Sequence, residues 1–349
     1  MGKCCVVVDF GCGKTKIAAF RMENGKPVLY SGTVTNTPEN GLSDADVVQG
    51  FALQLDKLAV KKGELVVVLP VDEKNTFAAE TEYPIGNSKD VGAMIRNNLT
   101  SLISEDVDQY THSWRLIESN SSGQGRFQVA ATKTASIEAL YDIAEKKGLN
   151  LTRVEIAPNV LERAGILLRR DKKYGINVQG DAVAVIDVGY SSAHITVISK
   201  DKCVSTISVP HDLYRLDKII MGSSQDLMKD PKIIPETLKL NPSFTSKISQ
   251  YNDFVENVSS EIIRNIKQAI GGEHNLHLTT IYFTGGMYKS PTLVSKVKDS
   301  FGVPCFAYPM NDFMRIGDNC ISFGHRCPHP TAELFTTSLG ALMGGKSFE

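Results

Sequence analysis

Two parts of the chain repeat the same order of apolar and polar residues. In each part, a run of apolar residues ends in Asp-x-Gly, at residues 4–11 and again at residues 182–189. A second apolar stretch, a short polar turn and a third apolar stretch follow each run. A continuous apolar run of this length is typical of a strand that is buried on both faces of a sheet. The repeat predicts a duplicated α/β protein in which each half begins with three adjacent strands.

The pattern outside the repeats predicts the remaining elements. In the first half we expect helix 44–55, strand 65–70, strand 76–82, helix 88–104, strand 113–118, strand 127–132, helix 134–147 and a strand from residue 154 that leads into helix 159–170. In the second half we expect helix 251–270, strand 279–284, helix 292–301, strand 304–308 and helix 331–343. Helix 251–270 carries an apolar stripe at helical spacing, which consists of Phe254, Val258, Ile262, Ile266 and Ile270.

These elements predict four regions. They are a first lobe at 1–72 and 151–180, an α/β insert in that lobe at 73–150, a second lobe at 181–212 and 273–349, and a helical lid at 213–272. The insert contains Trp114 in an apolar strand. We expect this side chain to be packed, and the alternative is that it forms a wall of a peptide groove.

Composition narrows the class of protein. The chain has 349 residues, of which 42% are hydrophobic, and it contains no apolar run long enough to cross a membrane. Its 38 basic and 39 acidic side chains give no overall field that would attract nucleic acid or acidic lipid. The N-terminus leads directly into a strand and does not resemble a signal peptide, so we expect a cytoplasmic protein. Seven cysteines, several within apolar runs, suit a reducing compartment.

The two Asp-x-Gly corners predict a phosphate site. The strand brings a carboxylate, Asp9 or Asp187, to the edge of the sheet, and Gly11 or Gly189 lets the backbone turn so that N–H groups face an anion. Two aspartates between facing corners can hold Mg²⁺ through its water shell. One such corner alone would be ordinary hairpin chemistry. The duplication favours the phosphate site.

A second cluster of polar residues suggests a metal. Cys320, His325, Cys327 and His329 lie within ten residues. They lack the paired Cys-x2-Cys and His-x3-His spacing with which a short loop surrounds zinc. We expect a polar surface loop here, with a zinc site as the alternative.

The motifs resemble those of a known superfamily. Asp9-x-Gly11 with Lys16, Asp187-x-Gly189 and Thr284-Gly285-Gly286 stand in the order of the two phosphate motifs and the adenosine motif of the actin, sugar kinase and Hsp70 superfamily. The position of the insert is similar to that in FtsA and in the type IV pilus assembly protein PilM. The stretches 127–133, 161–164, 261–264 and 338–342 also resemble the PilM family. This resemblance implies a duplicated actin-like (ribonuclease H-like) fold with two lobes and an inserted α/β subdomain.

The resemblance also implies a cofactor site for ATP and Mg²⁺. Gly11, Cys12, Gly13 and Lys16 would meet the β- and γ-phosphates, with Gly189 in the second corner and Asp9 and Asp187 on the magnesium side. Gly285 and Gly286 would admit adenine and ribose, and Glu261 would reach the ribose. The alternatives are a solvated lysine at Lys16, a simple turn at the glycine pair and an exposed helix charge at Glu261.

Two departures from the family pattern bear on hydrolysis. A glycine pair of PilM proteins is replaced here by Val209-Pro210-His211-Asp212, and one of two acids in the linking strand is replaced by Ala157. Glu155 remains as the candidate catalytic residue that would orient water. Since phosphoryl transfer needs a positioned nucleophile, we expect ATP binding with weak or no ATPase activity.

For PilM-like proteins the resemblance implies an adaptor function. The partner would be the N-terminal cytoplasmic peptide of a bitopic PilN-type membrane protein, held between the insert and the first lobe, and the adaptor would associate into a ring or filament. It would reach the membrane through that partner and would not insert into the bilayer. The alternatives are a sugar or acetate kinase of the same superfamily and a division or secretion component similar to FtsA or GspL.

Overall fold

The computed structural model describes most of the chain. The described residues are 4–11, 14–37, 51–53, 55–56, 58, 60–71, 76–86, 88–103, 105–171, 173–174, 180–199, 202–211, 245–271, 275–286, 290–317 and 332–344.

The first sheet has the strand order β14-β3-β2-β1-β4-β8. Its members are β1 (Cys4–Phe10), β2 (Lys14–Glu23), β3 (Lys26–Asn36), β4 (Gly63–Leu69), β8 (Leu149–Ile156) and β14 (Arg315–Ile316). β1, β2 and β3 are antiparallel, whereas β4 and β8 run parallel to β1. The turn from β2 to β3 places Asn24 and Gly25 at φ of 51° and 76°, a conformation that these two residue types tolerate.

The second sheet repeats the first. Its strand order is β11-β10-β9-β12-β13. The strands are β9 (Asp181–Val188), β10 (Ser192–Ser199), β11 (Lys202–Pro210), β12 (His277–Thr284) and β13 (Cys305–Ala307). β9, β10 and β11 are antiparallel, and β12 and β13 run parallel to β9. The order and directions match those of β3-β2-β1-β4-β8, so the predicted duplication is confirmed. We call each sheet with its helices a lobe.

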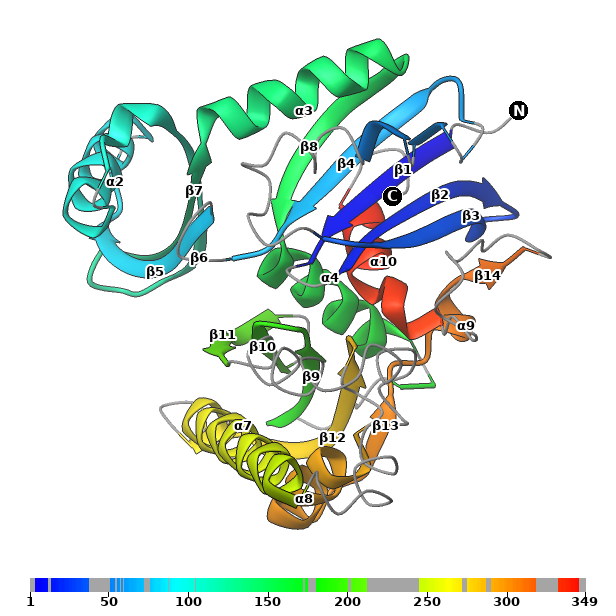
Figure 1. Cartoon of the computed structure of the whole chain (residues 1–349). Coiled ribbons are helices and arrows are strands. Elements are labelled where there is room, and N and C mark those ends of the chain that lie inside the picture. Colours follow the sequence, from blue (N-terminus) through cyan, green and yellow to red (C-terminus); the bar gives the residue numbers. More distant parts are fainter. Residues whose placement is uncertain are drawn as a thin grey trace.

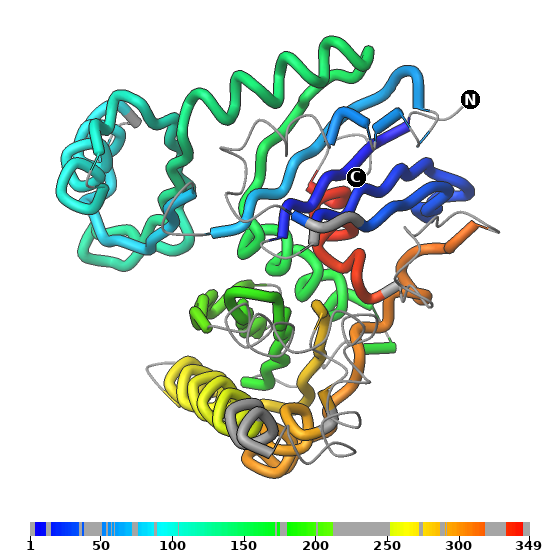
Figure 2. The backbone as a smooth tube through the Cα atoms, in the orientation of Figure 1, coloured from blue at the N-terminus to red at the C-terminus, as the bar shows by residue number. Residues whose placement is uncertain are grey.

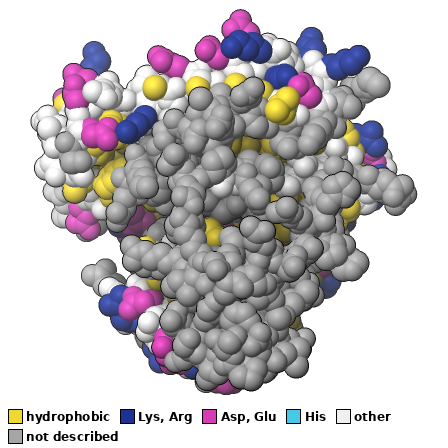
Figure 3. Space-filling model, viewed as in Figure 1, with side chains coloured by type: hydrophobic (Ala, Val, Ile, Leu, Met, Phe, Trp, Pro, Cys, Tyr) yellow, Lys and Arg dark blue, Asp and Glu magenta, His cyan; other side chains and the backbone are white. Residues whose placement is uncertain are grey.

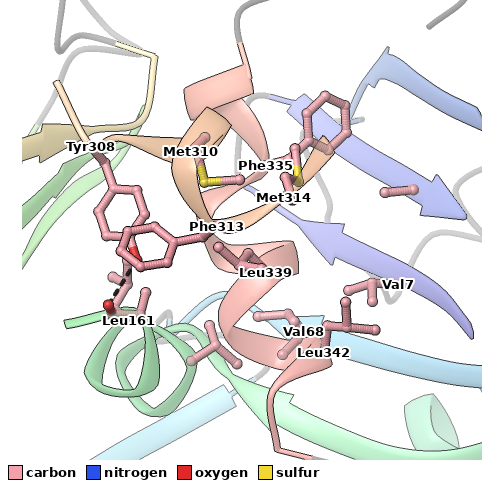
Figure 4. Packing of buried hydrophobic residues seen from close by; sticks show 14 of the residues in the cluster. Val7, Val68, Leu161, Tyr308, Met310, Phe313, Met314, Phe335, Leu339 and Leu342 are labelled. Carbon is pink, nitrogen blue, oxygen red and sulfur yellow. Dashed lines mark hydrogen bonds between the residues drawn. The ribbon is translucent and has the colours of Figure 1, made fainter. Parts of the chain in front are cut away.

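Two helices lie between the lobes, α4 (Ala157–Arg170) and α10 (Thr336–Leu342) (Figure 1). Figure 4 shows how side chains of the first sheet, α4, α10 and the segment after β13 converge there. The Tyr308 hydroxyl donates to the carbonyl oxygen of Ala164 over 2.8 Å. α10 approaches α4 so closely that a Cβ at Gly340 would lie 1.9 Å from the carbonyl oxygen of Val160. This interface therefore admits only glycine at residue 340.

The outer faces of both sheets are covered by helices. On the first sheet, α3 (Thr134–Lys146) buries Leu140, Ile143 and Ala144 in the same core as β1 and β4. On the second sheet, α7 (Thr245–Gly271) and α8 (Pro291–Phe301) pack against β9, β10 and β12 (Figure 1). The predicted stripe of α7 faces this core: Val258, Ile262 and Ile266 are buried, and Phe254 and Ile270 are partly buried.

The insert forms a third sheet of its own, in the order β5-β7-β6. It contains β5 (Thr76–Pro84), β6 (Tyr110–Ser119), β7 (Gln124–Lys133), α2 (Ser88–Leu102) and the 3-10 turn η2 (Val107–Gln109). Trp114 packs against α2, since a Cβ at Gly92 would lie 2.9 Å from its ring. On the other face, Arg115 forms an ion pair with Glu162 of α4, and Arg126 donates to the carbonyl oxygen of Val204 in β11 over 3.3 Å. The insert thus contacts both the connecting helix and the second lobe.

The C-terminal part departs in detail from the predicted pattern. We expected one helix at 331–343, whereas a 3-10 turn η5 (Ala332–Phe335) precedes α10. The short α9 (Met310–Phe313) and β14 were not predicted, because four and two residues are too few to show a period. β14 pairs with β3, and α10, drawn in red, lies beneath the blue strands of the first lobe (Figure 2). Of predicted helix 44–55, residues 44–50 and 54 lie outside the described part of the chain, and residues 51–53 and 55 are helical.

The described surface carries charges of both signs. On the face in Figure 3, acidic and basic side chains are interspersed along the upper edge of the molecule and around the insert. No described helix has both the length and the apolar character needed to cross a lipid bilayer.

Candidate functional site

The first Asp-x-Gly corner holds a buried ion pair. Asp9 is 4% exposed near the end of β1, and the register of β1 and β2 places it opposite Lys16. The Lys16 Nζ lies 2.6 Å from Asp9 Oδ2. Burial works to lower the pKa of Lys16, but the negative charges of Asp9 and Asp187 outweigh it and raise that pKa. Lys16 is therefore a charged, desolvated cation and not a solvated surface lysine.

The second corner brings another carboxylate to the same place. Asp187 lies in β9 and is 8% exposed. Burial raises the pKa of Asp187 to about 6, Lys16 opposes this increase, and Asp9 adds to it. Two buried carboxylates thus share one ammonium group, which leaves an excess of negative charge. A divalent cation would relieve that excess.

The donor set suits magnesium held through water. Among the described residues there is no group of three or more His, Cys, Asp or Glu side chains that could enclose a metal directly. Mg²⁺ keeps most of its waters and commonly takes one or two carboxylates. Asp9 and Asp187 fit such a hydrated ion better than a directly coordinated one.

The predicted adenosine motif packs against Asp187. Gly285 follows β12 with φ of +87°, and a Cβ there would lie 2.2 Å from Asp187 Oδ1 and 2.6 Å from the carbonyl oxygen of Val188. Glycine is therefore required at 285 by packing against the second corner. A Cβ at Gly286 would meet nothing within 4 Å, so space is open beside that residue. In the second corner itself, the Gly189 N–H donates to the carbonyl oxygen of Ser192 over 3.0 Å.

Three threonines belong to this site: Thr284 is part of the predicted Thr284-Gly285-Gly286 motif, whereas Thr336 and Thr337 were missed in the sequence. The Thr337 hydroxyl of α10 donates to Asp9 Oδ2. The hydroxyls of Thr284 and Thr336 lie 2.8 Å apart, and Thr284 is the β-sheet partner of Asp187. The available signal was the run of hydroxyl residues 336–338 at the start of an otherwise apolar helix.

A buried histidine adjoins the second corner. His194 in β10 is the cross-strand partner of Asp187. Its Nδ1 lies 2.8 Å from the Ser208 hydroxyl, and its Nε2 lies 3.3 Å from the Ser192 hydroxyl. Burial lowers the pKa of His194 to about 4, with Asp9 opposing and His211 adding to the change. This imidazole is neutral at physiological pH and organises the hydroxyls around the corner.

Two predicted site residues make other contacts. Glu155 Oε1 lies 2.9 Å from both Arg153 and Arg163. The same two arginines donate to the last carbonyl groups of α10, so Glu155 belongs to an anchor of that helix. Glu261 on α7 forms an ion pair with Arg264. Neither acid has a contact with Asp9, Lys16 or Asp187 among the described residues.

Several other predicted residues lie outside the described part of the chain. Of the predicted first phosphate loop, Gly11 is described, and Thr37 donates to its carbonyl oxygen over 2.6 Å. Cys12 and Gly13 are not described, nor is the candidate zinc cluster Cys320, His325, Cys327 and His329.

Comparisons with known proteins agree with this architecture. The family model described as "Type IV pilus assembly protein PilM" matches residues 87–322. No curated protein sequence matches the chain.

Among solved structures, a PilM-PilN type IV pilus biogenesis complex is similar with a TM-score of 0.67 at 16% identity, covering 97% of this chain and 98% of the other. The ethanolamine utilization protein EutJ from Carboxydothermus hydrogenoformans is similar with a TM-score of 0.50 at 16% identity, covering 98% of this chain and 90% of the other. A Bacteroides thetaiotaomicron protein with an actin-like ATPase fold is similar with a TM-score of 0.52 at 7% identity, covering 90% of this chain and 93% of the other. The chain therefore has the actin-like ATPase fold and belongs to the family of the type IV pilus assembly protein PilM.

Proposed function

We propose that this type IV pilus assembly component binds ATP with Mg²⁺ between its two Asp-x-Gly corners. The observation that carries the proposal is the buried group of Asp9, Lys16 and Asp187, in which two carboxylates share one ammonium. Buried charges without compensation are unfavourable, so this arrangement suits a ligand that brings both a cation and phosphates.

In this proposal each predicted residue has a role. Lys16 and the backbone of Gly11, Cys12 and Gly13 bind the β- and γ-phosphates, and Asp9 and Asp187 accept hydrogen bonds from the waters of Mg²⁺. The backbone of Gly189 lies in the second phosphate loop. Adenosine occupies the open space beside Gly286, with Glu261 reaching toward the ribose. Bound magnesium would supply charge neutralisation for the phosphates.

We further propose that hydrolysis is slow. Glu155 was the predicted candidate for orienting water, and its carboxylate is held by Arg153 and Arg163. A carboxylate that is engaged by two guanidinium groups is a poor general base. ATP therefore acts mainly as a ligand that sets the arrangement of the lobes.

The proposed role is that of a cytoplasmic adaptor for a PilN-type membrane protein. The N-terminal peptide of that partner would lie between the insert and the first lobe, and the partner would attach the adaptor to the inner face of the membrane. Self-association into a ring or filament would complete the platform. The similarity to a PilM-PilN complex supports this proposal.

A peptide titration tests the adaptor role. Trp114 is the single tryptophan and lies in the insert, so its fluorescence reports on that subdomain. A synthetic N-terminal peptide of a PilN-type protein from the same organism should change the emission and saturate, both with and without Mg·ATP. A scrambled peptide is the control. If neither fluorescence nor calorimetry detects binding of the native peptide, the adaptor role is wrong.

A further inference from the structure

The first turn of α10 touches the first Asp-x-Gly corner and the strand that lies beside the second. Thr336 and Thr337 are 1% and 3% exposed, although α10 otherwise presents Leu339, Ala341 and Leu342 to the apolar core. Buried hydroxyl groups need partners, and these two have them in different lobes. Thr337 donates to Asp9 of the first lobe, and Thr336 lies 2.8 Å from Thr284 of the second.

Within the described part of the chain, the donors that hold Asp9 reach one of its two oxygens. Lys16 and Thr337 both donate to Oδ2, so Oδ1 carries neither of these bonds. The terminal torsion of an aspartate is broad, and a single donor would leave the plane of the carboxylate poorly defined. Two donors from different elements, β2 and α10, fix that plane. Neither of these two donors occupies Oδ1, which can face the hydration shell of a cation.

The second lobe is fixed to the same turn. The Thr284 and Thr336 hydroxyls lie 2.7 and 2.8 Å from the carbonyl oxygen of Glu333. Thr284 pairs with Asp187 in the sheet, and the next residue, Gly285, packs against the Asp187 carboxylate. A continuous series of contacts thus runs from Asp9 through the start of α10 to Asp187. The separation of the two carboxylates depends on this turn.

We propose that Thr337 is a positioning residue for the hydrated divalent cation of the nucleotide complex. Its hydroxyl orients the Asp9 carboxylate, and its neighbour Thr336 ties the same turn to the strand beside Asp187. The inference rests on the proposed nucleotide function and adds a residue that binds neither phosphate nor base. Preorganised partners of this kind determine how well a carboxylate receives a metal.

The test compares Mg²⁺-dependent and Mg²⁺-independent ATP binding. Thr337→Val removes the hydroxyl with little change in volume, Thr337→Ala removes it without any risk of crowding Asp9, and Thr337→Ser retains it. The matched control is Thr196→Val, the same substitution at a fully buried threonine of β10. Calorimetric titration of each protein with ATP is carried out in excess Mg²⁺ and in EDTA, with the thermal midpoint as a check of folding.

The expected result is a selective loss. Since a hydrogen bond to a charged group contributes about as much as a ten-fold change in an equilibrium constant, the increase in ATP affinity on adding Mg²⁺ should fall about ten-fold in Thr337→Val and Thr337→Ala. Affinity in EDTA should stay at the wild-type value. Thr337→Ser and Thr196→Val should retain the full Mg²⁺ effect.

Three outcomes would overturn the inference. The first is a full Mg²⁺ effect in both hydroxyl-free variants, and the second is an equal loss in Mg²⁺ and in EDTA, which would indicate a merely structural threonine. The third is a loss of the Mg²⁺ effect on ATP affinity in Thr337→Ser, which retains the hydroxyl group. Wild-type protein that binds ATP in neither condition would instead overturn the proposed function, and the inference with it.

Discussion

Replacing Asp187 with asparagine should make the nucleotide-free protein more stable at neutral and alkaline pH. The pKa of Asp187 rises from its ordinary value of 3.8 to about 6, mainly because of burial. Below the ordinary pKa of 3.8 the side chain is protonated in both the folded and the unfolded chain, so its ionisation does not affect the stability of the fold. As the pH rises through about 4 to 6, the unfolded chain releases this proton more readily than the folded chain does. The free energy of unfolding therefore falls. Asparagine has no charge to bury.

The size of the effect follows from the two pKa values. A ten-fold difference in proton affinity is ~1.4 kcal/mol, so the ionised Asp187 destabilises the empty fold by roughly 3 kcal/mol at high pH. Burying the asparagine amide costs about 1 kcal/mol or more, which leaves a net gain of about 1–2 kcal/mol. At about pH 5 the ionisation of Asp187 causes only part of its full destabilisation. The difference in free energy of unfolding between the variant and the wild type should therefore grow by about 1–1.5 kcal/mol between about pH 5 and about pH 8.

The assay is urea unfolding followed by circular dichroism, in EDTA and without nucleotide. Asp181→Asn is a matched control, because Asp181 lies in the same strand, is also 8% exposed, and pairs with His277 at 3.2 Å. This control should show no gain, since it loses the carboxylate that contacts His277. An Asp187→Asn protein that is less stable than wild type at about pH 8, or whose advantage does not grow with pH, would refute the electrostatic account of the site.

Three further predictions concern single residues. Gly340→Ala should lower the thermal midpoint strongly or prevent folding, because its Cβ would meet the carbonyl oxygen of Val160 at 1.9 Å, whereas Gly286→Ala, with open space, should leave the midpoint unchanged. Glu155→Gln should lower the midpoint but leave any ATPase rate unchanged, and a selective loss of ATPase would restore the catalytic prediction. Lys16→Met should destabilise the empty protein, more at high pH than at low pH, and should abolish ATP binding measured by calorimetry.

Much of the fold was predictable because its strands are long and bounded by turns. Residues 4–11 and 182–189 carried the duplication, and both sheets have the same strand order. The three strands and helix 88–104 of the insert were also predictable, since each shows a clear period before the next turn. Helix 134–147 was expected within the insert, whereas α3 packs in the core of the first sheet. β14 was not predictable, because its two residues show no period of their own and pair with β3, which is distant in the sequence.

The site was predictable only in part. Asp9, Lys16 and Asp187 follow from local motifs and lie together. The bond from Thr337 to Asp9 joins residues 328 positions apart, and no local pattern specifies such a contact. Gly285 was predicted as a space for the base, whereas its backbone conformation and its contact with Asp187 already require glycine. Long-range packing, and not local chemistry, decides these details.

The most direct test of the account is a calorimetric titration of the purified protein with ATP and Mg²⁺, repeated on Asp187→Asn. We expect saturable binding to the wild-type protein that weakens strongly when Mg²⁺ is removed, and loss of the Mg²⁺-dependent binding in the variant. No binding to the folded wild-type protein, or unchanged binding to the variant, would contradict the claim that the two Asp-x-Gly corners form a magnesium–nucleotide site.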